Sequence, residues 1–275
     1  MNYSLYENFY SNGLGYWFWF AVICWVGCSL GSFLNVCIWR MPLGESVITA
    51  PSHCPKCGHK IRWYENIPLF SFLCLRARCS GCKQPITWRY FIVELLTGAL
   101  FAMAYAAITY KNMYFALIIP MGAMIMLAVA AAFIDAEHRI IPDALNYPAM
   151  ITGVIFWGAE WLSGAVKWQA FAAVLVCGFA AWGFFYLLSL LGEKLFKTDA
   201  LGLGDVKFLT AAAFLFGPFM FVEYFTGLLL ASLSGFLYGV VFCLIKKQSL
   251  RNCTLPFGPF LAAGMVIAMF LPNLK

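Results

Sequence analysis

The chain has 275 residues, of which 63% are apolar and 11% are charged, and its net charge is +6. Soluble domains carry about 25% charged residues, so this composition excludes both a soluble globular protein and an intrinsically disordered one. It predicts an all-α polytopic membrane protein in a lipid bilayer, whose few charges mark where the chain leaves the membrane.

Eight stretches of at least 15 residues lack Asp, Glu, Lys and Arg, and they are 8–39, 95–110, 112–134, 144–159, 168–192, 208–222, 224–245 and 252–274. Each predicts a helix, because lipid offers no hydrogen-bond partners to an open backbone. A membrane crossing needs about 20 mostly apolar residues. The stretch 208–222 is the weakest, because Gly217-Pro218 breaks it, and it predicts a short helix over about 206–216. The sequence therefore predicts about eight transmembrane helices.

The positions of Lys and Arg predict the orientation. With the N-terminus outside, 15 of the 18 basic residues fall on four inner loops, which are 40–89, 135–143, 193–207 and 246–251. This asymmetry satisfies the positive-inside rule. A basic cytoplasmic face suits anionic lipid, so the net charge predicts no nucleic-acid partner. We expect three parts: an N-terminal transmembrane helix over 1–39, a cytoplasmic loop over 40–89 and a seven-helix membrane core over 90–275.

The loop 40–89 contains two CxxC pairs, and their cysteines are Cys54, Cys57, Cys79 and Cys82. Four thiolates at this spacing are typical of a tetrahedral structural zinc site, which leaves no open position for catalysis. Two disulfides are the alternative, although a loop on the reducing side of the membrane argues against them. His53 and His59 flank the first pair, either as substitute ligands or as exposed polar residues.

Ionisable residues inside or at the edge of a membrane are functional candidates. Asp135 ends the apolar run 127–134, and Asp205 lies in the sequence Gly202-Leu-Gly-Asp205 before the short helix. If the two aspartates share one site, one carboxyl keeps its proton while the other ionises, and the pair can act as base and acid in hydrolysis. The glycines next to Asp205 would allow the backbone or a substrate strand to approach closely.

Each of these acids also has a structural interpretation. Asp205 could cap the short helix, and Asp135 could pair with Arg139 at i+4. Asp143, which follows a proline, is expected to cap the next helix. A third buried acid, Glu94, is either functional or paired with Arg89 or Arg40.

Taken together, the motifs resemble bacterial type IV prepilin peptidases, the bifunctional leader peptidases and N-methyltransferases of the GxGD aspartic protease family. The resemblance rests on five segments in chain order, which are Gly31-Ser-Phe-Leu-Asn35, Cys54-Pro-Lys-Cys57, Cys79-Ser-Gly-Cys82, Gly202-Leu-Gly-Asp205 and Pro256-Phe-Gly258-Pro259. Ala77 stands where the family usually has glycine, and Phe91 where it usually has proline.

The resemblance implies a multi-pass protein of the bacterial inner membrane. It also implies that Asp135 and Asp205 cut the basic leader from type IV prepilins and type II secretion pseudopilins at the cytoplasmic face. The new N-terminal residue would then be methylated with S-adenosylmethionine, and Glu94 is a candidate for binding this cofactor. The motifs leave the natural substrates and the oligomeric state open.

Three other functions are compatible with parts of the sequence. A membrane thiol oxidoreductase would use paired cysteines, but it needs them on the oxidising side. An intramembrane zinc protease needs an HExxH motif, which the chain lacks. A secretion scaffold with a zinc loop would leave both aspartates unexplained. Archaeal preflagellin peptidases share the GxGD motif, but the resemblance implies that they lack the zinc loop.

Overall fold

The computed structural model describes residues 13–48, 52–196, 201–246 and 255–271. Across these ranges the chain is helical, with isolated β-bridges in place of strands, so the all-α prediction is confirmed. Residues 1–12 of the first predicted part, and the segments 197–200 and 247–251 of two predicted inner loops, lie outside the described residues. The chain forms two compact units, residues 1–118 and residues 119–275.

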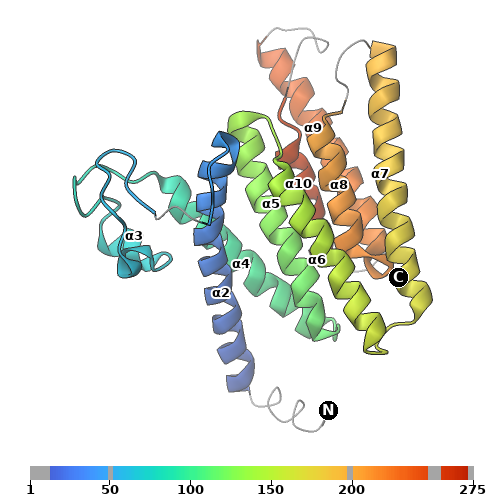
Figure 1. Ribbon diagram of the computed structural model, residues 1–275, viewed down its shortest axis with the longest axis horizontal. Coiled ribbons are helices and arrows are strands. Elements are labelled where there is room, and N and C mark those ends of the chain that lie inside the picture. Colours follow the sequence, from blue (N-terminus) through green and yellow to red (C-terminus); the bar gives the residue numbers. More distant parts are fainter. Residues whose placement is uncertain (1–12, 49–51, 197–200, 247–254, 272–275) are drawn as a thin grey trace. The chain divides into compact units, whose positions relative to one another are not determined.

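Unit 1 is a pair of long helices with a polar loop between them in the sequence (Figure 1). Helix α2, Gly13–Arg40, packs along α4, Trp88–Tyr110, and glycines let the two backbones approach closely. A Cβ on Gly31 of α2 would lie 2.8 Å from the Cα of Glu94 on α4. The loop and the segment after α4 contain short helices, which are η1 (Met41–Leu43), η2 (Trp63–Asn66), α3 (Phe70–Cys74) and η3 (Phe115–Leu117). The structure thus groups α4 with the first helix and the loop.

In its described residues, unit 2 is a bundle of six helices, which are α5 (Ile118–His138), α6 (Asp143–Leu162), α7 (Trp168–Phe196), α8 (Leu203–Phe216), α9 (Phe221–Lys246) and α10 (Gly258–Phe270). A short 3-10 helix, η4 (Pro218–Met220), joins α8 to α9. Helix α8 lies inside the bundle and contacts α6, α7, α9 and α10. Every residue from Phe208 to Phe216 is buried, which explains why this short helix is apolar all round.

The predicted break after the short helix is confirmed. Helix α8 ends at Phe216, and Gly217 adopts φ 57°, a left-handed conformation that favours glycine. Pro218 then begins η4. The indole of Trp157 on α6 covers Gly217, because a Cβ there would lie 2.9 Å from the ring. The chain therefore turns tightly at this point and enters α9.

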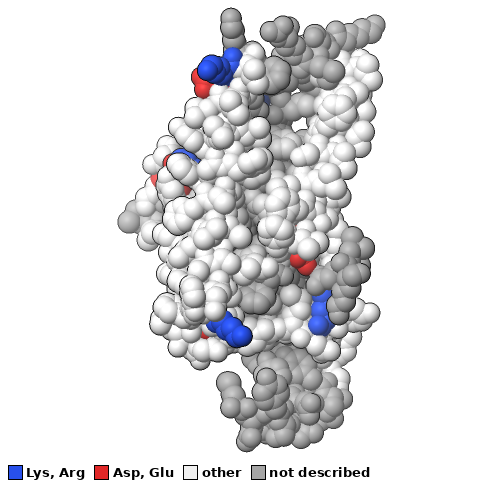
Figure 2. Space-filling model, turned by 90° about the vertical axis from the view of Figure 1, so that its right-hand side faces the viewer, with Lys and Arg blue, Asp and Glu red and all other residues white. Residues whose placement is uncertain are grey.

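Within the described residues, each of the eight charge-free stretches overlaps a helix, and five helices there are long and apolar enough to cross a membrane by length and composition. They are α2, α4, α5 (counted together with η3), α7 and α9. Only 17% of the most apolar window of α7, and 11% of that of α9, is buried within the protein. Figure 2 shows a face on which charged side chains form a few separate groups with broad uncharged surface between them. The chain is a multi-pass membrane protein, and the number of eight crossings stays a prediction.

Candidate active site and metal centre

Two similar turns in the polar loop of unit 1 present the cysteines. In the first turn the N–H of Cys54 donates to the carbonyl of His59, and the N–H of Gly58 donates to the carbonyl of Cys54, each at 2.9 Å. The second turn repeats this pattern, with the N–H of Lys83 donating to the carbonyl of Cys79 at 3.0 Å. Gly58 and Lys83 occupy equivalent positions and have positive φ values of 69° and 57°. The loop thus contains two equivalent cysteine turns.

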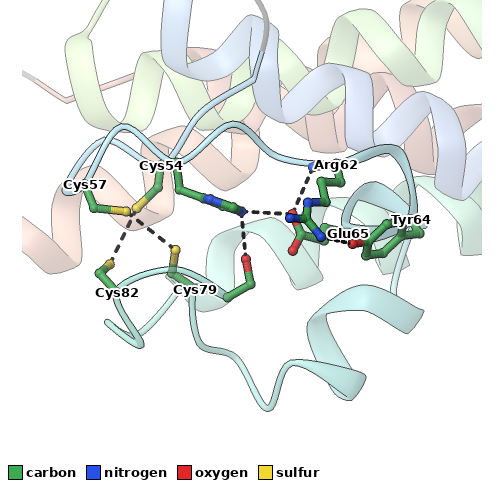
Figure 3. A network of polar contacts seen from close by, with 9 residues as sticks. Cys54, Cys57, Arg62, Tyr64, Glu65, Cys79 and Cys82 are labelled. Atoms are coloured by element: carbon green, nitrogen blue, oxygen red, sulfur yellow. Dashed lines mark hydrogen bonds and ion pairs between the residues drawn. The ribbon is translucent and has the colours of Figure 1, made fainter.

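The four cysteine sulfurs converge on one point (Figure 3). The Sγ atoms of Cys54 and Cys82 are 4.0 Å apart, those of Cys57 and Cys79 are 3.9 Å apart, and all four lie within 4.8 Å of one another. Tetrahedral zinc with Zn–S bonds of about 2.3 Å places its sulfurs roughly 3.8 Å apart. All four side chains are free thiols, so the alternative of two disulfides is not what the structure contains. The cluster can bind a metal ion.

Backbone N–H groups favour the thiolate form at two of the four cysteines, whereas burial and the neighbouring cysteines help to raise the pKa of Cys57 to about 11. The N–H of Lys56 is the main reason that the pKa of Cys54 is lowered to about 7. The N–H of Cys82 likewise lowers the pKa of Cys79 below its ordinary value. Thiolates, not thiols, are the metal ligands, so these N–H groups favour the binding form.

His59 links the two halves of the loop and lies outside the sulfur cluster. Its Nε2 is 3.3 Å from a carboxylate oxygen of Glu65 and 3.0 Å from the hydroxyl of Ser80. The same oxygen of Glu65 accepts the N–H of Arg62 at 2.9 Å. His59 therefore stabilises the loop through hydrogen bonds. His53 forms a backbone bridge with Lys60 beside the first turn.

Asp135 lies near the end of α5, where it is 6% exposed. Its Oδ2 accepts the backbone N–H of Gly258 at 2.8 Å. Gly258 is the first residue of α10, so the carboxylate binds one of the N–H groups that a helix start leaves unsatisfied. The positive charge of Arg139 also acts on Asp135. The anticipated attraction from Arg139 thus accompanies a more specific contact with α10.

Asp205 lies in the first turn of α8, three residues after the N-cap Gly202. It is therefore not the cap itself, although its carboxyl group interacts with the backbone of Gly202. Gly204 packs against the segment that follows α5, since a Cβ there would lie 3.2–3.3 Å from the side chain and backbone of Ile141. This contact joins α8 to the α5–α6 connection. The two carboxyl groups lie near enough for the negative charge of Asp135 to act on Asp205.

The two glycines of the GxGD sequence have different roles. A side chain at Gly204 would press on Ile141, whereas Gly202 has φ −62° and only ordinary van der Waals space next to Asp205. The expectation of a close backbone approach is therefore met at Gly204. At Gly202 the backbone conformation is open to other residues.

Asp143 does not cap α6, contrary to expectation. The N-cap is Pro142, and Asp143 is the first helical residue. Both of its carboxylate oxygens accept from the Nζ of Lys207 on α8, at 2.7 Å. The reason is that the starts of α6 and α8 lie together, so a lysine from the second helix reaches the acid. Lys207 is thereby neutralised locally, two residues after Asp205.

Glu94 is buried in α4, with 8% of its surface exposed. Its Oε2 accepts the backbone N–H of Leu69 at 2.8 Å, which ties the polar loop to the helix pair. Leu69 has φ 62°, an uncommon conformation for a branched residue. The carboxyl group also interacts with Ser32 of α2.

Sequence reasoning about roles missed two residues, Gly258 and Ser32, although both lie inside motifs that carried the family resemblance. Gly258 supplies the N–H that binds Asp135, and Ser32 contacts Glu94. The sequence did mark both positions, because Gly258 lies in a segment rich in glycine and proline and Ser32 lies in a polar segment of an apolar stretch. Their partners are distant in the sequence, so the contacts needed the structure.

Two family models match the chain. The bacterial peptidase A24 N-terminal domain matches residues 25–108, and the type IV leader peptidase family matches residues 121–244. The first match lies within unit 1 and the second within unit 2. No solved structure matches the chain.

Several characterised proteins are similar over most of the chain. The type 4 prepilin-like proteins leader peptide-processing enzyme of Escherichia coli is 36% identical over 269 residues, covering 90% of this chain and 92% of that protein. The prepilin leader peptidase/N-methyltransferase of Pseudomonas aeruginosa is 33% identical, with 90% and 89% covered. A protein with the same description from Myxococcus xanthus is 40% identical, with 84% of this chain but 65% of that protein covered.

Proposed function

Because the chain belongs to the type IV leader peptidase family, we propose that it cleaves the leader peptide from type IV prepilins and type II secretion pseudopilins. The observation that carries this proposal is that Asp135 and Asp205 lie near enough in unit 2 for the charge of one to act on the other, with each carboxyl group at the start of a short helix. Paired carboxyl groups are the catalytic machinery of aspartic proteases.

The proposed mechanism uses the two aspartates as base and acid. Two carboxyl groups at one site do not both ionise readily, so one accepts a proton from water while the other protonates the peptide group. Water adds to the scissile carbonyl carbon, the C–N bond breaks, and the leaving amine takes up a proton. The N–H of Gly258 holds Asp135 in place through these steps.

We place the aspartate pair and the polar loop at the cytoplasmic face of the inner membrane, with the N-terminus outside. The distribution of basic residues supports this orientation. A basic leader would also be retained on this side by the same rule, and an acidic site suits it.

We also propose that the protein methylates the new N-terminus. S-adenosylmethionine would supply the methyl group, so that an N–C bond forms as the C–S bond breaks and the amine loses a proton. The names of relatives support this activity, and the buried acid Glu94 is the candidate for the methyltransferase site. In unit 1, Cys54, Cys57, Cys79 and Cys82 would hold a structural zinc.

Mass spectrometry of a prepilin after incubation with the protein and S-adenosylmethionine tests both activities. We expect two products, a mature pilin and its methylated form, whose masses report cleavage and methylation separately. Asp135→Asn and Asp205→Asn should each abolish cleavage while the protein stays folded, because each removes an ionisable oxygen from the pair. Normal processing by either variant would refute the dyad.

Asp143→Asn is the matched control. This variant removes an acid near the same helix starts. The interaction that it breaks is an exposed ion pair, which contributes little to stability. It should therefore retain cleavage. A loss equal to that of the dyad variants would show that the assay reports general damage to this region.

A further inference from the structure

Unit 1 contains a cavity that neither the sulfur cluster nor the aspartate pair uses. It has a volume of about 360 Å³ and lies between α2 and the polar loop. Its α2 wall is formed by residues at helical spacing and its loop wall includes an amide, and six of the lining residues are Ser29, Ser32, Phe33, Val36, Arg40 and Asn66. Sites for small molecules begin at about 300 Å³, so the cavity is large enough for one.

One wall of the cavity joins it to the buried acid of α4. The hydroxyl of Ser32 lies 3.4 Å from the Oδ1 of Asn66 across the cavity wall. The side chain of Ser32 also interacts with the carboxyl group of Glu94. Glu94 lies directly against α2 because Gly31 has no side chain there. Oxygen atoms therefore predominate here, and they suit a cation or an N–H donor.

Arg40 and Phe33 provide a different chemistry in the same cavity. Arg40 is 6% exposed, and its guanidinium donates to the carbonyl of Ser46 at 3.2 Å. Its permanent charge attracts a carboxylate. Phe33 is 45% exposed, and an aromatic ring can stack on a nucleobase or attract a cation.

We propose that this cavity binds S-adenosylmethionine, an inference that rests on the proposed N-methyltransferase activity. The ligand carries two cationic groups, a carboxylate and an adenine, and the cavity offers partners for each kind. The oxygens of Ser32 and Asn66 face the cationic groups, Arg40 faces the carboxylate, and Phe33 receives the adenine. Glu94 acts through Ser32 as a positioning residue. The peptidase residues lie in unit 2, so this cavity is available for the second activity.

Binding of tritiated S-adenosylmethionine to the purified full-length protein tests the site. Val36→Phe fills the cavity from the α2 side and should abolish binding and methylation while leader cleavage continues. Val26→Phe is the matched control, because it makes the same change on the same helix at a residue that is 42% exposed and does not line the cavity. It should bind the cofactor like the wild type.

Asn66→Ala is a second variant that keeps the test decisive if Val36→Phe disturbs folding. Asn66 is exposed, so its loss should leave the protein folded and weaken binding. Wild-type binding by both Val36→Phe and Asn66→Ala would overturn the cavity assignment, while methylation by the wild type would leave the proposed function intact. A wild-type protein that cleaves but neither binds nor methylates would overturn both.

Discussion

Gly258→Ala should slow leader cleavage by disturbing Asp135. A Cβ on Gly258 would lie 2.8 Å from both the Cβ and the Oδ2 of Asp135, closer than side chains normally pack. Relief requires α10 or Asp135 to move, and either movement breaks the 2.8 Å bond from the Gly258 N–H. A hydrogen bond to a charged group contributes about 1.5–3 kcal/mol. If this stabilisation is lost in the transition state, cleavage slows by roughly ten- to 150-fold.

The assay is the rate of leader removal from a prepilin by purified full-length protein. Gly183→Ala is the matched control, because a Cβ there would meet no atom within 4 Å and alanine suits a helix interior. Equal thermal unfolding temperatures of the two variants would show that Gly258→Ala is folded. Cleavage by Gly258→Ala at the wild-type rate would refute the idea that this contact positions Asp135.

Two further predictions concern the polar loop. Replacing Cys54 and Cys57 together by serine should remove about one zinc per chain in metal analysis. Cys74→Ser changes an exposed thiol outside the cluster and should keep the zinc. Equal metal content in the two variants would exclude the site. Ala77 has φ 55°, a conformation that favours glycine, so Ala77→Gly should stabilise the protein by about 1 kcal/mol in thermal unfolding. Ala99→Gly in α4 should instead destabilise it by about 1 kcal/mol. Stability changes of the same sign in both variants would refute backbone strain at Ala77.

Charge and turn residues were sufficient to predict most of the helices. A stretch without charges can enter lipid only as a helix, so each long one marks an element. The break at Gly217-Pro218 was predictable because proline cannot continue a helix and glycine favours the left-handed turn. The cysteine cluster was predictable because two CxxC turns bring four sulfurs together at short range. These signals are all local in the sequence.

The contacts that position the acids were not predictable from local signals. Asp135 and Gly258 are 123 residues apart, and Lys207 reaches Asp143 across 64 residues. Apolar helices give little indication of their neighbours, because almost any face can meet lipid or another helix. Small residues such as Gly204 mark close packing but do not identify the partner. The pairing of helices, and thus the second half of each site, had to come from the structure.

The starts of α8 and α10 help to explain how two acids can lie close together in an apolar bundle. Each helix begins beside one of these acids, since Asp205 occupies the first turn of α8 and the carboxylate of Asp135 accepts the N–H of Gly258, the first residue of α10. A helix start carries a partial positive charge and unsatisfied N–H groups. The two helix starts therefore stabilise one ionised carboxylate, whereas burial and the negative charge of the neighbouring acid destabilise it.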